Sequence, residues 1–156
     1  MRRHIITTIL SLAAAGAMTM QPTQAASKSP GTMFAEECSA CHMAFDPGFL
    51  PKRSWRAIMG NLSNHFGEDA SLDDQTRNAI ERYLLSNAAD ANGRNPYWLR
   101  RIPASQIPMR ITELPWFTNE HGARARAWAK SNPKIGSISN CQGCHRGAAR
   151  GVFDDD

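Results

Sequence analysis

The sequence predicts an all-α protein built from two small lobes, in which short helices alternate with extensive irregular loops. Two observations point to this fold class. Residues that favour strands are scarce, because valine occurs once in 156 residues and tyrosine twice, whereas sheets are usually rich in β-branched and aromatic side chains. The four cysteines form two close pairs, and residues 42–140 separate one pair from the other. This spacing predicts one lobe around each pair, and each lobe is too small to bury a large core on its own.

The first 25 residues have the features of a secretory signal peptide. Arg2 and Arg3 precede an apolar run over residues 5–17, and a small-residue cleavage site ends at Ala25. The apolar run is too short to span a membrane. Cleavage removes two of the 18 basic side chains and none of the 14 acidic ones, which leaves a charge too small to indicate nucleic-acid binding. We therefore expect a periplasmic protein with a signal peptide over residues 1–25, an N-terminal lobe over 26–93 and a C-terminal lobe over 94–156.

Each cysteine pair is followed directly by a histidine. The two strings are Cys38-Ser39-Ala40-Cys41-His42 and Cys141-Gln142-Gly143-Cys144-His145. Cys-x-x-Cys-His is the attachment signature of c-type haem. The two thiols form thioethers to the porphyrin vinyl groups, and the adjacent imidazole reaches the iron from the same side. The sequence therefore predicts two covalently bound haem c groups, named here haem 1 (Cys38 and Cys41) and haem 2 (Cys141 and Cys144).

Two other uses of cysteine pairs fit the pattern less well. A structural zinc site built from two Cys-x-x-Cys knuckles usually has them about 15 to 20 residues apart, much closer than in this chain. A disulfide framework is normal in exported proteins, and a single Cys-x-x-Cys pair can form a redox-active disulfide. Neither explains why a histidine follows both pairs or why there is no further cysteine.

Two haems have four axial positions, and the exported chain contains four histidines. If His42 and His145 bind the two irons on the side of the thioethers, His65 and His121 are the only imidazoles left for the opposite sides. His65 follows His42 by 23 residues, and His121 precedes His145 by 24. This proximity predicts His42 and His65 at the iron of haem 1, and His145 and His121 at the iron of haem 2. A swapped pairing of the two distal histidines stays open.

Methionine is the alternative sixth ligand, and His/Met ligation raises the reduction potential relative to bis-histidine ligation. The candidates are Met33, Met59 and Met109, because Met43 is too close to His42 to reach the other face of the porphyrin. Methionine on a helical face more often fills a core. The sequence therefore favours histidine at both distal positions.

Both distal histidines are expected on helices. Apolar residues recur at helical spacing over residues 54–67 and place His65 on their stripe. Thr118 has the side chain of an N-cap, which predicts a helix over 118–130 that carries His121 on one face with Trp128.

The rest of the chain is expected to contain three further helices and one long connection. The predicted helices cover residues 32–41, with the first haem string, about 71–92, and the second haem string to about Gly151. The proline-rich segment 94–115 is expected to wrap the first lobe in an extended form, because it also contains several large apolar residues.

Six segments spread over nearly the whole exported chain carry a resemblance to a known family. They are residues 38–43 (CSACHM), 50–59 (LPKRSWRAIM), 65–72 (HFGEDASL), 83–84 (YL), 111–117 (ITELPWF) and 141–145 (CQGCH). In these segments the chain resembles the bacterial dihaem cytochrome c family, small exported proteins with two covalently bound haems. The resemblance implies bis-histidine ligation by His42, His65, His121 and His145. It also implies electron exchange with a small oxygen-binding monohaem cytochrome and with a membrane cytochrome b of the b561 type.

Together these features predict two cytochrome c-like haem lobes that carry single electrons in the periplasm. Four histidines for four axial positions leave no open iron, so we expect no catalytic residues and no enzymatic activity. Two alternatives stay open. A peroxidase-like haem enzyme would need a labile axial position with acid–base groups beside it. A gas-binding or redox-sensing protein would need one distal histidine that dissociates on reduction.

Overall fold

The computed structural model describes residues 28–153, and within this range the protein is helical. The predicted all-α fold is confirmed: no strand forms among these residues, and the only ladder contact is an isolated bridge between His65 and Glu68. The predicted signal peptide lies outside the described residues. No helix in the described range is long and apolar enough to cross a membrane. The α-helices are α1 (Pro30–Cys38), α2 (Lys52–Met59), α3 (Asp74–Asn87), α4 (Tyr97–Arg100), α5 (Pro115–Glu120) and α6 (Ala123–Ser131). The 3-10 helices are η1 (Pro47–Phe49), η2 (Leu62–Asn64), η3 (Ala91–Gly93), η4 (Ile111–Glu113), η5 (Cys141–Gly143) and η6 (Ala148–Arg150).

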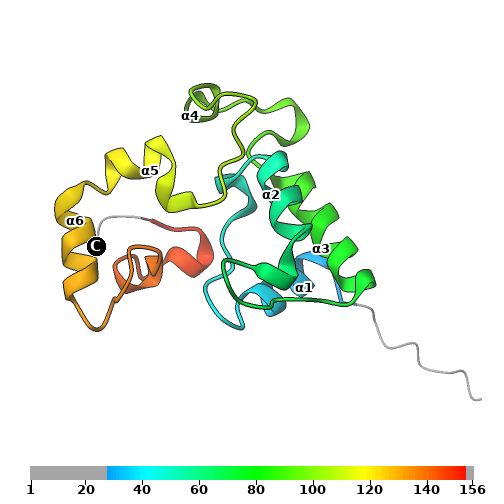
Figure 1. Ribbon diagram of the computed structural model, residues 1–156, viewed down its shortest axis with the longest axis horizontal. Helices are drawn as coiled ribbons and strands as arrows, with labels where there is room; N and C mark the ends of the chain where they lie inside the picture. Colours follow the sequence, from blue (N-terminus) through cyan, green and yellow to red (C-terminus); the bar gives the residue numbers. More distant parts are fainter. Residues whose placement is uncertain (1–27, 154–156) are drawn as a thin grey trace, which may run out of the picture.

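Helices α1, α2 and α3 pack together around the main hydrophobic core (Figure 1). α1 begins after Ser29, whose hydroxyl accepts a hydrogen bond from the Thr32 amide. α3 begins after Asp73, whose carboxylate accepts one from the Thr76 amide. Such caps satisfy amides that the first turn of a helix leaves without partners. The large side chains buried in this core include Phe34, Leu50, Trp55, Ile58, Met59, Ile80 and Leu84.

The proline-rich connection lies against this core, as predicted for residues 94–115, but α4 and η4 form in it, so it is not extended throughout. Leu99 of α4 and Ile102 beyond it are buried there, and Leu114 is 1 % exposed. From α2, the guanidinium Nε of Arg53 donates a hydrogen bond of 2.7 Å to the Gln106 carbonyl. The core therefore contains side chains from both sides of the residue 93/94 boundary, and the division into two lobes at that point stays a prediction.

The predicted helix over residues 32–41 ends one turn early. α1 stops at Cys38, because the Ser39 amide makes the last bond of the helix, to the Ala35 carbonyl. Cys41 and His42 follow in a turn. The predicted helix over about 71–92 likewise ends early, at Asn87, and η3 follows it.

The helix predicted over residues 54–67 is wrong beyond Met59. α2 ends there, η2 follows, and His65 stands in a tight turn in which it exchanges two backbone hydrogen bonds with Glu68. Phe66 and Gly67 have φ angles of 56° and 107°. A right-handed helix cannot continue through residues in this left-handed region.

The helix predicted over residues 118–130 is divided in two, with His121 between the parts. Gly122 is extended (ψ 179°), so α5 ends at Glu120 and α6 starts at Ala123. Thr118 lies inside α5 rather than at its N-cap, and Trp128 is 53 % exposed rather than buried beside His121. The helix predicted for the second haem string is also wrong, because only the short η5 and η6 form there.

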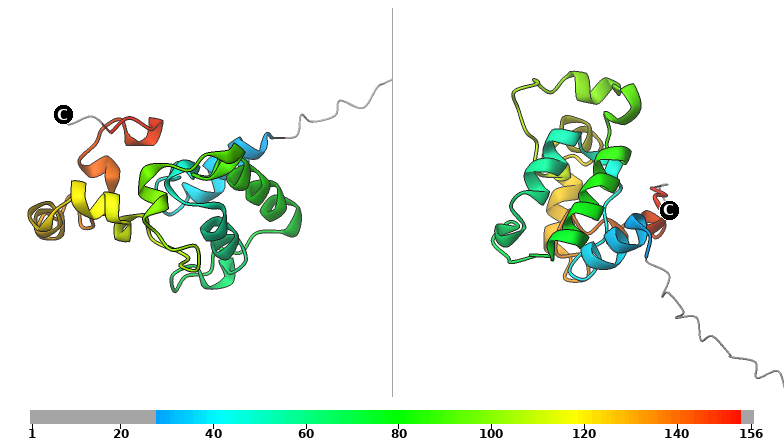
Figure 2. Two further views of the ribbon diagram at one scale, coloured as in Figure 1. Left: turned by 90° about the horizontal axis from the view of Figure 1, so that it is seen from above. Right: turned by 90° about the vertical axis from the view of Figure 1, so that its right-hand side faces the viewer.

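The C-terminal segment folds back beside the three-helix core, toward the loop that contains η1 (Figures 1 and 2). The Phe49 ring in η1 lies 5.4 Å from the Phe153 ring and 5.7 Å from the Trp116 ring. The indole Nε1 of Trp55 donates a hydrogen bond of 2.8 Å to the Pro47 carbonyl. Trp55 of α2 therefore fixes η1, and Phe49 of η1 contacts Trp116 and Phe153 of the C-terminal half.

Replacing Trp55 by phenylalanine should lower the free energy of unfolding by about 2 kcal/mol. The variant leaves the buried Pro47 carbonyl with only the longer bond of 3.4 Å from the Leu50 amide, and it removes part of a packed ring. Guanidinium denaturation followed by far-UV circular dichroism measures the change. Trp128→Phe is the matched control, since this side chain is 53 % exposed and its replacement should change stability by less than about 0.5 kcal/mol. Equal effects of the two variants would show that the Trp55 hydrogen bond does not stabilise the fold.

Candidate haem sites

None of the four cysteines forms a disulfide, and all four lie in the two segments that the sequence predicts to hold haem. Cys38 and Cys141 are half-buried, while Cys41 and Cys144 are exposed. Burial, with a smaller contribution from the Glu37 carboxylate, raises the pKa of Cys38 to about 11. Before a thioether forms, burial therefore favours the neutral thiol at Cys38 over the thiolate. Within residues 28–153, no three His, Cys, Asp or Glu side chains come together in a group that could hold a metal ion.

At the first site, the histidine of the haem string faces the predicted distal histidine. The ring centres of His42 and His65 are 6.1 Å apart, and their planes differ by 24°. Nδ1 of His42 donates a hydrogen bond of 2.7 Å to the Met43 carbonyl, which leaves Nε2 as the free nitrogen. Burial, together with the nearby His42 and Arg110 side chains, lowers the pKa of His65. The neutral imidazole, the form that binds a metal ion, is therefore favoured at His65.

At the second site, the same arrangement recurs with a different ring angle. The ring centres of His121 and His145 are 6.0 Å apart, and their planes differ by 83°. Nδ1 of His121 is 3.2 Å from the Phe117 carbonyl, so its donor role again leaves Nε2 free. The His145 amide donates to the Cys141 carbonyl at 2.8 Å, a bond that ties this histidine to the haem string.

The separation of the rings fits an iron between them. An imidazole nitrogen binds a divalent metal ion at about 2.0 Å, which puts the ring centres of two imidazoles on opposite sides of one ion about 6 Å apart. The observed separations are 6.1 Å and 6.0 Å. Both pairs combine a string histidine with the distal candidate nearest to it in sequence. The residues present therefore fit two haems, each with one imidazole on either side.

A cavity of about 630 Å³ lies between the two haem strings. Its lining includes Cys41 and His42 from the first string, Gln142 from the second string, and Asn140 directly before it. The two strings therefore come close together in the fold. Sequence reasoning gave no sign of this proximity, because the strings are far apart along the chain.

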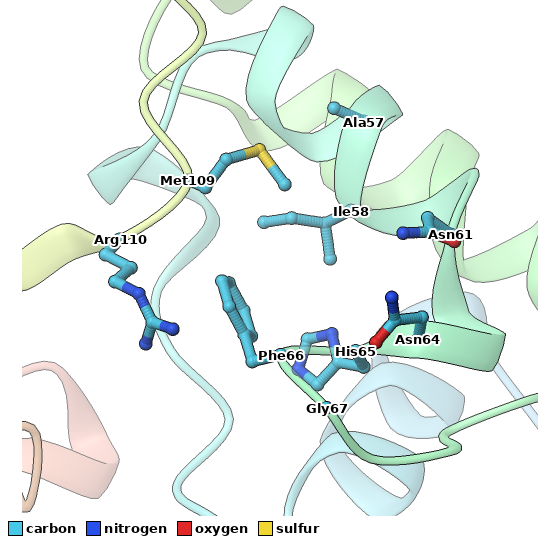
Figure 3. A pocket seen from close by; sticks show the side chains of 9 residues that line it. All are labelled: Ala57, Ile58, Asn61, Asn64, His65, Phe66, Gly67, Met109 and Arg110. Carbon is cyan, nitrogen blue, oxygen red and sulfur yellow. The ribbon is translucent and has the colours of Figure 1, made fainter.

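A second cavity, of about 340 Å³, adjoins the turn that carries His65 (Figure 3). Met109 and Arg110 of the connection line it together with Phe66. The Arg110 guanidinium carbon lies 4.2 Å from the centre of the Phe66 ring, a cation–π contact. The Arg110 Nε is also 3.7 Å from a carboxylate oxygen of Glu113. These contacts hold the left-handed turn next to His65 against the proline-rich connection.

Trp116 lies close to the second site, and its buried indole N–H has no hydrogen-bond acceptor among the described residues. Its ring centre is 5.7 Å from that of Phe117, which stacks on His121. Its Nε1 and the Ser54 hydroxyl are the two buried side-chain polar atoms without a hydrogen-bond partner among the described residues. A buried donor without an acceptor is costly. The two propionate groups of a haem would supply such acceptors, which agrees with the fit of the ring pairs.

Sequence reasoning missed three residues that hold the distal histidines in place. Phe117 precedes His121 by four residues, a spacing at which side chains of successive helical turns meet, and this signal was present. Gly67 after Phe66 signalled a possible left-handed turn. Arg110 had no signal, because it is distant in sequence from the turn that it contacts.

The chain matches a protein-family model and is similar to solved structures. The family model described as "Dihaem cytochrome c" matches residues 34–153. The structure is similar to a diheme cytochrome c from Rhodobacter sphaeroides, with 48 % sequence identity, a TM-score of 0.71, and coverage of 78 % of this chain and 95 % of that one. The search of curated proteins gave no match.

Two further solved structures resemble the chain at similar levels. A crystal structure of DHC purified from Rhodobacter sphaeroides has 46 % identity and a TM-score of 0.62, and the match covers 78 % of this chain and 96 % of that one. A diheme c-type cytochrome from Shewanella baltica OS155 has 39 % identity and a TM-score of 0.66, with 80 % and 88 % covered.

Proposed function

Because this chain belongs to the dihaem cytochrome c family, we propose that it is a periplasmic electron-transfer protein in which two histidines bind each haem iron. The chain carries two covalently bound haem c groups, in keeping with its two Cys-x-x-Cys-His strings. When bound, each haem supplies an iron that alternates between the ferric and ferrous states. The protein side chains tune this change through ligand identity, burial and hydrogen bonds.

The observation that carries the proposal is the pair of imidazole gaps. The rings of His42 and His65 are 6.1 Å apart and those of His121 and His145 are 6.0 Å apart, the separation that two axial imidazoles need. Both gaps support the direct pairing of string and distal histidines over the swapped one. With four histidines in these roles, no axial position is left for a substrate.

The methionines give less support to the rival ligation. Met59 is 3 % exposed and packed in the core, and Met33 packs against the same core. Met109 lines the cavity beside His65, but the His65 ring is the group that faces His42. We therefore assign the distal positions to His65 and His121.

Hydrogen bonds from Nδ1, the nitrogen that does not bind the iron, influence how strongly the proposed ligands donate to the metal. A backbone carbonyl accepts from Nδ1 of His42 and another from Nδ1 of His121. Such bonds fix the tautomer and the ring orientation, and they make the imidazole a stronger donor to the metal. A stronger donor favours the ferric state, which supports low reduction potentials at both sites.

The proposed location and partners are those of an exported electron carrier. The signal-peptide features of residues 1–25 support export, since c-type haem is attached outside the bacterial inner membrane. Residues 94–156 contain 10 basic and 5 acidic side chains, whereas residues 26–93 contain 6 and 9. Such asymmetry helps to orient a carrier on a charged partner. From the resemblance noted above, we propose a small oxygen-binding monohaem cytochrome and a b561-type membrane cytochrome as redox partners.

Carbon monoxide tests whether both irons lack an open or labile position. Adding it to the dithionite-reduced protein should leave the Soret band unchanged over minutes, because bound imidazoles block access to the ferrous iron. The variant His121→Gly is the positive control, and its haem 2 should bind carbon monoxide at once. A fast, stoichiometric Soret shift in the unaltered protein would contradict the carrier proposal. It would favour a haem enzyme or a gas sensor with one dissociable histidine.

A further inference from the structure

The two ring pairs have nearly the same separation, but the angle between the imidazole planes differs. The planes of His42 and His65 differ by 24°, and those of His121 and His145 by 83°, at nearly equal separations. The first pair is therefore close to parallel and the second close to perpendicular. Nothing in the two Cys-x-x-Cys-His strings or in the spacing of the histidines anticipates this difference.

The orientation of the His121 ring is fixed by a single neighbour, Phe117. The two rings stack with centres 4.1 Å apart and planes 11° apart. The Phe117 carbonyl also receives the His121 amide at 2.8 Å and lies 3.2 Å from Nδ1. Phe117 itself is 4 % exposed in the core. The His121 imidazole therefore cannot turn about its own axis without leaving the stack and losing its hydrogen bond.

Two further contacts hold the second site. The guanidinium Nε of Arg126 donates to the His121 carbonyl at 3.0 Å, which fixes the backbone between α5 and α6. The facing His145 ring meets the Phe153 ring edge-on, with centres 5.8 Å apart and planes 71° apart. Each of the two crossed imidazoles is thus held by an aromatic neighbour of its own.

At the first site, a different set of contacts holds the rings nearly parallel. The His42 ring stacks on Phe45 with planes 25° apart, and its Nδ1 donates to the Met43 carbonyl. The His65 ring meets the Phe66 ring edge-on, with planes 68° apart. Apart from the facing His42 ring, no aromatic ring among residues 28–153 lies flat against His65 in the way that Phe117 lies flat against His121.

We propose that Phe117 is a positioning residue that holds the His121 imidazole across the His145 imidazole, and that haem 2 is therefore electronically different from haem 1. This inference rests on the proposed function, in which the four histidines are the axial ligands. Side chains around a ligand are known to orient it and so to tune its metal.

The electronic consequence follows from the direction of imidazole π donation. Each axial imidazole raises the iron d orbital that lies perpendicular to its own plane. Parallel rings raise the same orbital, so the d levels are well separated and the ferric spectrum has three resolved lines. Crossed rings raise two orbitals equally, so these levels are nearly equal in energy. The ferric spectrum is then highly anisotropic and shows one dominant line at very low field.

The predicted difference between the two haems can be tested by electron paramagnetic resonance of the oxidised holoprotein at liquid-helium temperature. We expect two low-spin ferric signals of equal spin count, one with three resolved lines and one with a single dominant low-field line. Two three-line signals would overturn the inference about ring angles and leave bis-histidine ligation intact. A stoichiometric high-spin signal would instead overturn the proposed ligation. The two failures are therefore distinguishable.

The variant Phe117→Leu tests the role of the positioning residue. Without the flat ring, the His121 imidazole is free to turn, and the low-field line should be lost or moved while the three-line signal stays. Phe34→Leu is the matched control, because Phe34 is also buried (6 %) but packs against Tyr83 and not against a histidine. Its spectrum should equal that of the unaltered protein.

Conservative replacement separates positioning from packing. Phe117→Tyr keeps the flat ring and should retain the low-field line. If Phe117→Leu does not fold with two haems, Phe117→Met keeps the volume without a ring and should have the same spectral effect. A Leu or Met variant with two haems by mass and an unchanged spectrum would overturn the role of Phe117.

Discussion

Replacing Cys141 and Cys144 together by serine should remove one haem and most of the order of the C-terminal part. Beyond residue 118, the buried apolar side chains among the described residues are Ala129, Ile135 and Ala148. Two alanines and one isoleucine bury little apolar area, so this region would depend on the haem to fill its interior. We expect the mass of the purified protein to fall by one haem. Cleavage by a protease within residues 118–153 should become about tenfold faster or more, which corresponds to a loss of only about 1.4 kcal/mol of local stability.

The same change at the other string is the control. Replacing Cys38 and Cys41 by serine should also remove one haem, but α1, α2 and α3 retain a core of large side chains such as Trp55 and Ile80. Protease resistance should therefore fall less in the N-terminal part than it falls in the C-terminal part of the first variant. Equal losses would mean that haem contributes equally to both parts, against the reasoning from burial.

Replacing His65 by methionine should raise the reduction potential of haem 1, and replacing His121 by methionine should raise that of haem 2. A thioether donates less strongly than an imidazole and favours the ferrous state. Axial ligands set haem potentials over a range of about 0.8 V, so we expect an upward shift on the order of 100 mV. A spectroelectrochemical titration of each variant measures both potentials. The potential of the other haem should stay nearly constant.

Met109→Leu is the control for the haem 1 experiment. Met109 lines the cavity beside His65, so it is the methionine best placed to compete as a ligand. Its replacement by leucine should leave both potentials and both absorption spectra unchanged. If Met109→Leu alters haem 1 while His65→Met does not, methionine is the distal ligand and the assignment of His65 is wrong.

Sequence reasoning gave the right fold class, because the composition of the whole chain decides it. The scarcity of strand-forming residues led to the all-α prediction, and α3 begins within about three residues of the predicted start near residue 71. The sequence also indicated the two Cys-x-x-Cys-His strings and the packing of residues 94–115 against the core. In each case the signal lies within a few neighbouring residues, or in the composition of the whole chain.

The helices predicted around both distal histidines were wrong for the same physical reason. Helical spacing of apolar residues continued past His65 and past His121, but the backbone turns at each of them. Phe66 is in the left-handed region, and Gly122 is extended. Periodicity reports which face is apolar, but it does not report where a chain must leave its helix to present an imidazole. The angle between two rings depends on contacts such as that of Phe117, which no pattern of residue types specifies.

The cavity bordered by both haem strings has a consequence for the capacity of the molecule. Haems attached to these two strings would lie near each other, and an electron could then pass between them inside one polypeptide without a second collision. A docking protein that reaches only one haem would then have access to two reducing equivalents in succession. With both proposed haems in place, the protein would store two electrons and release them one at a time.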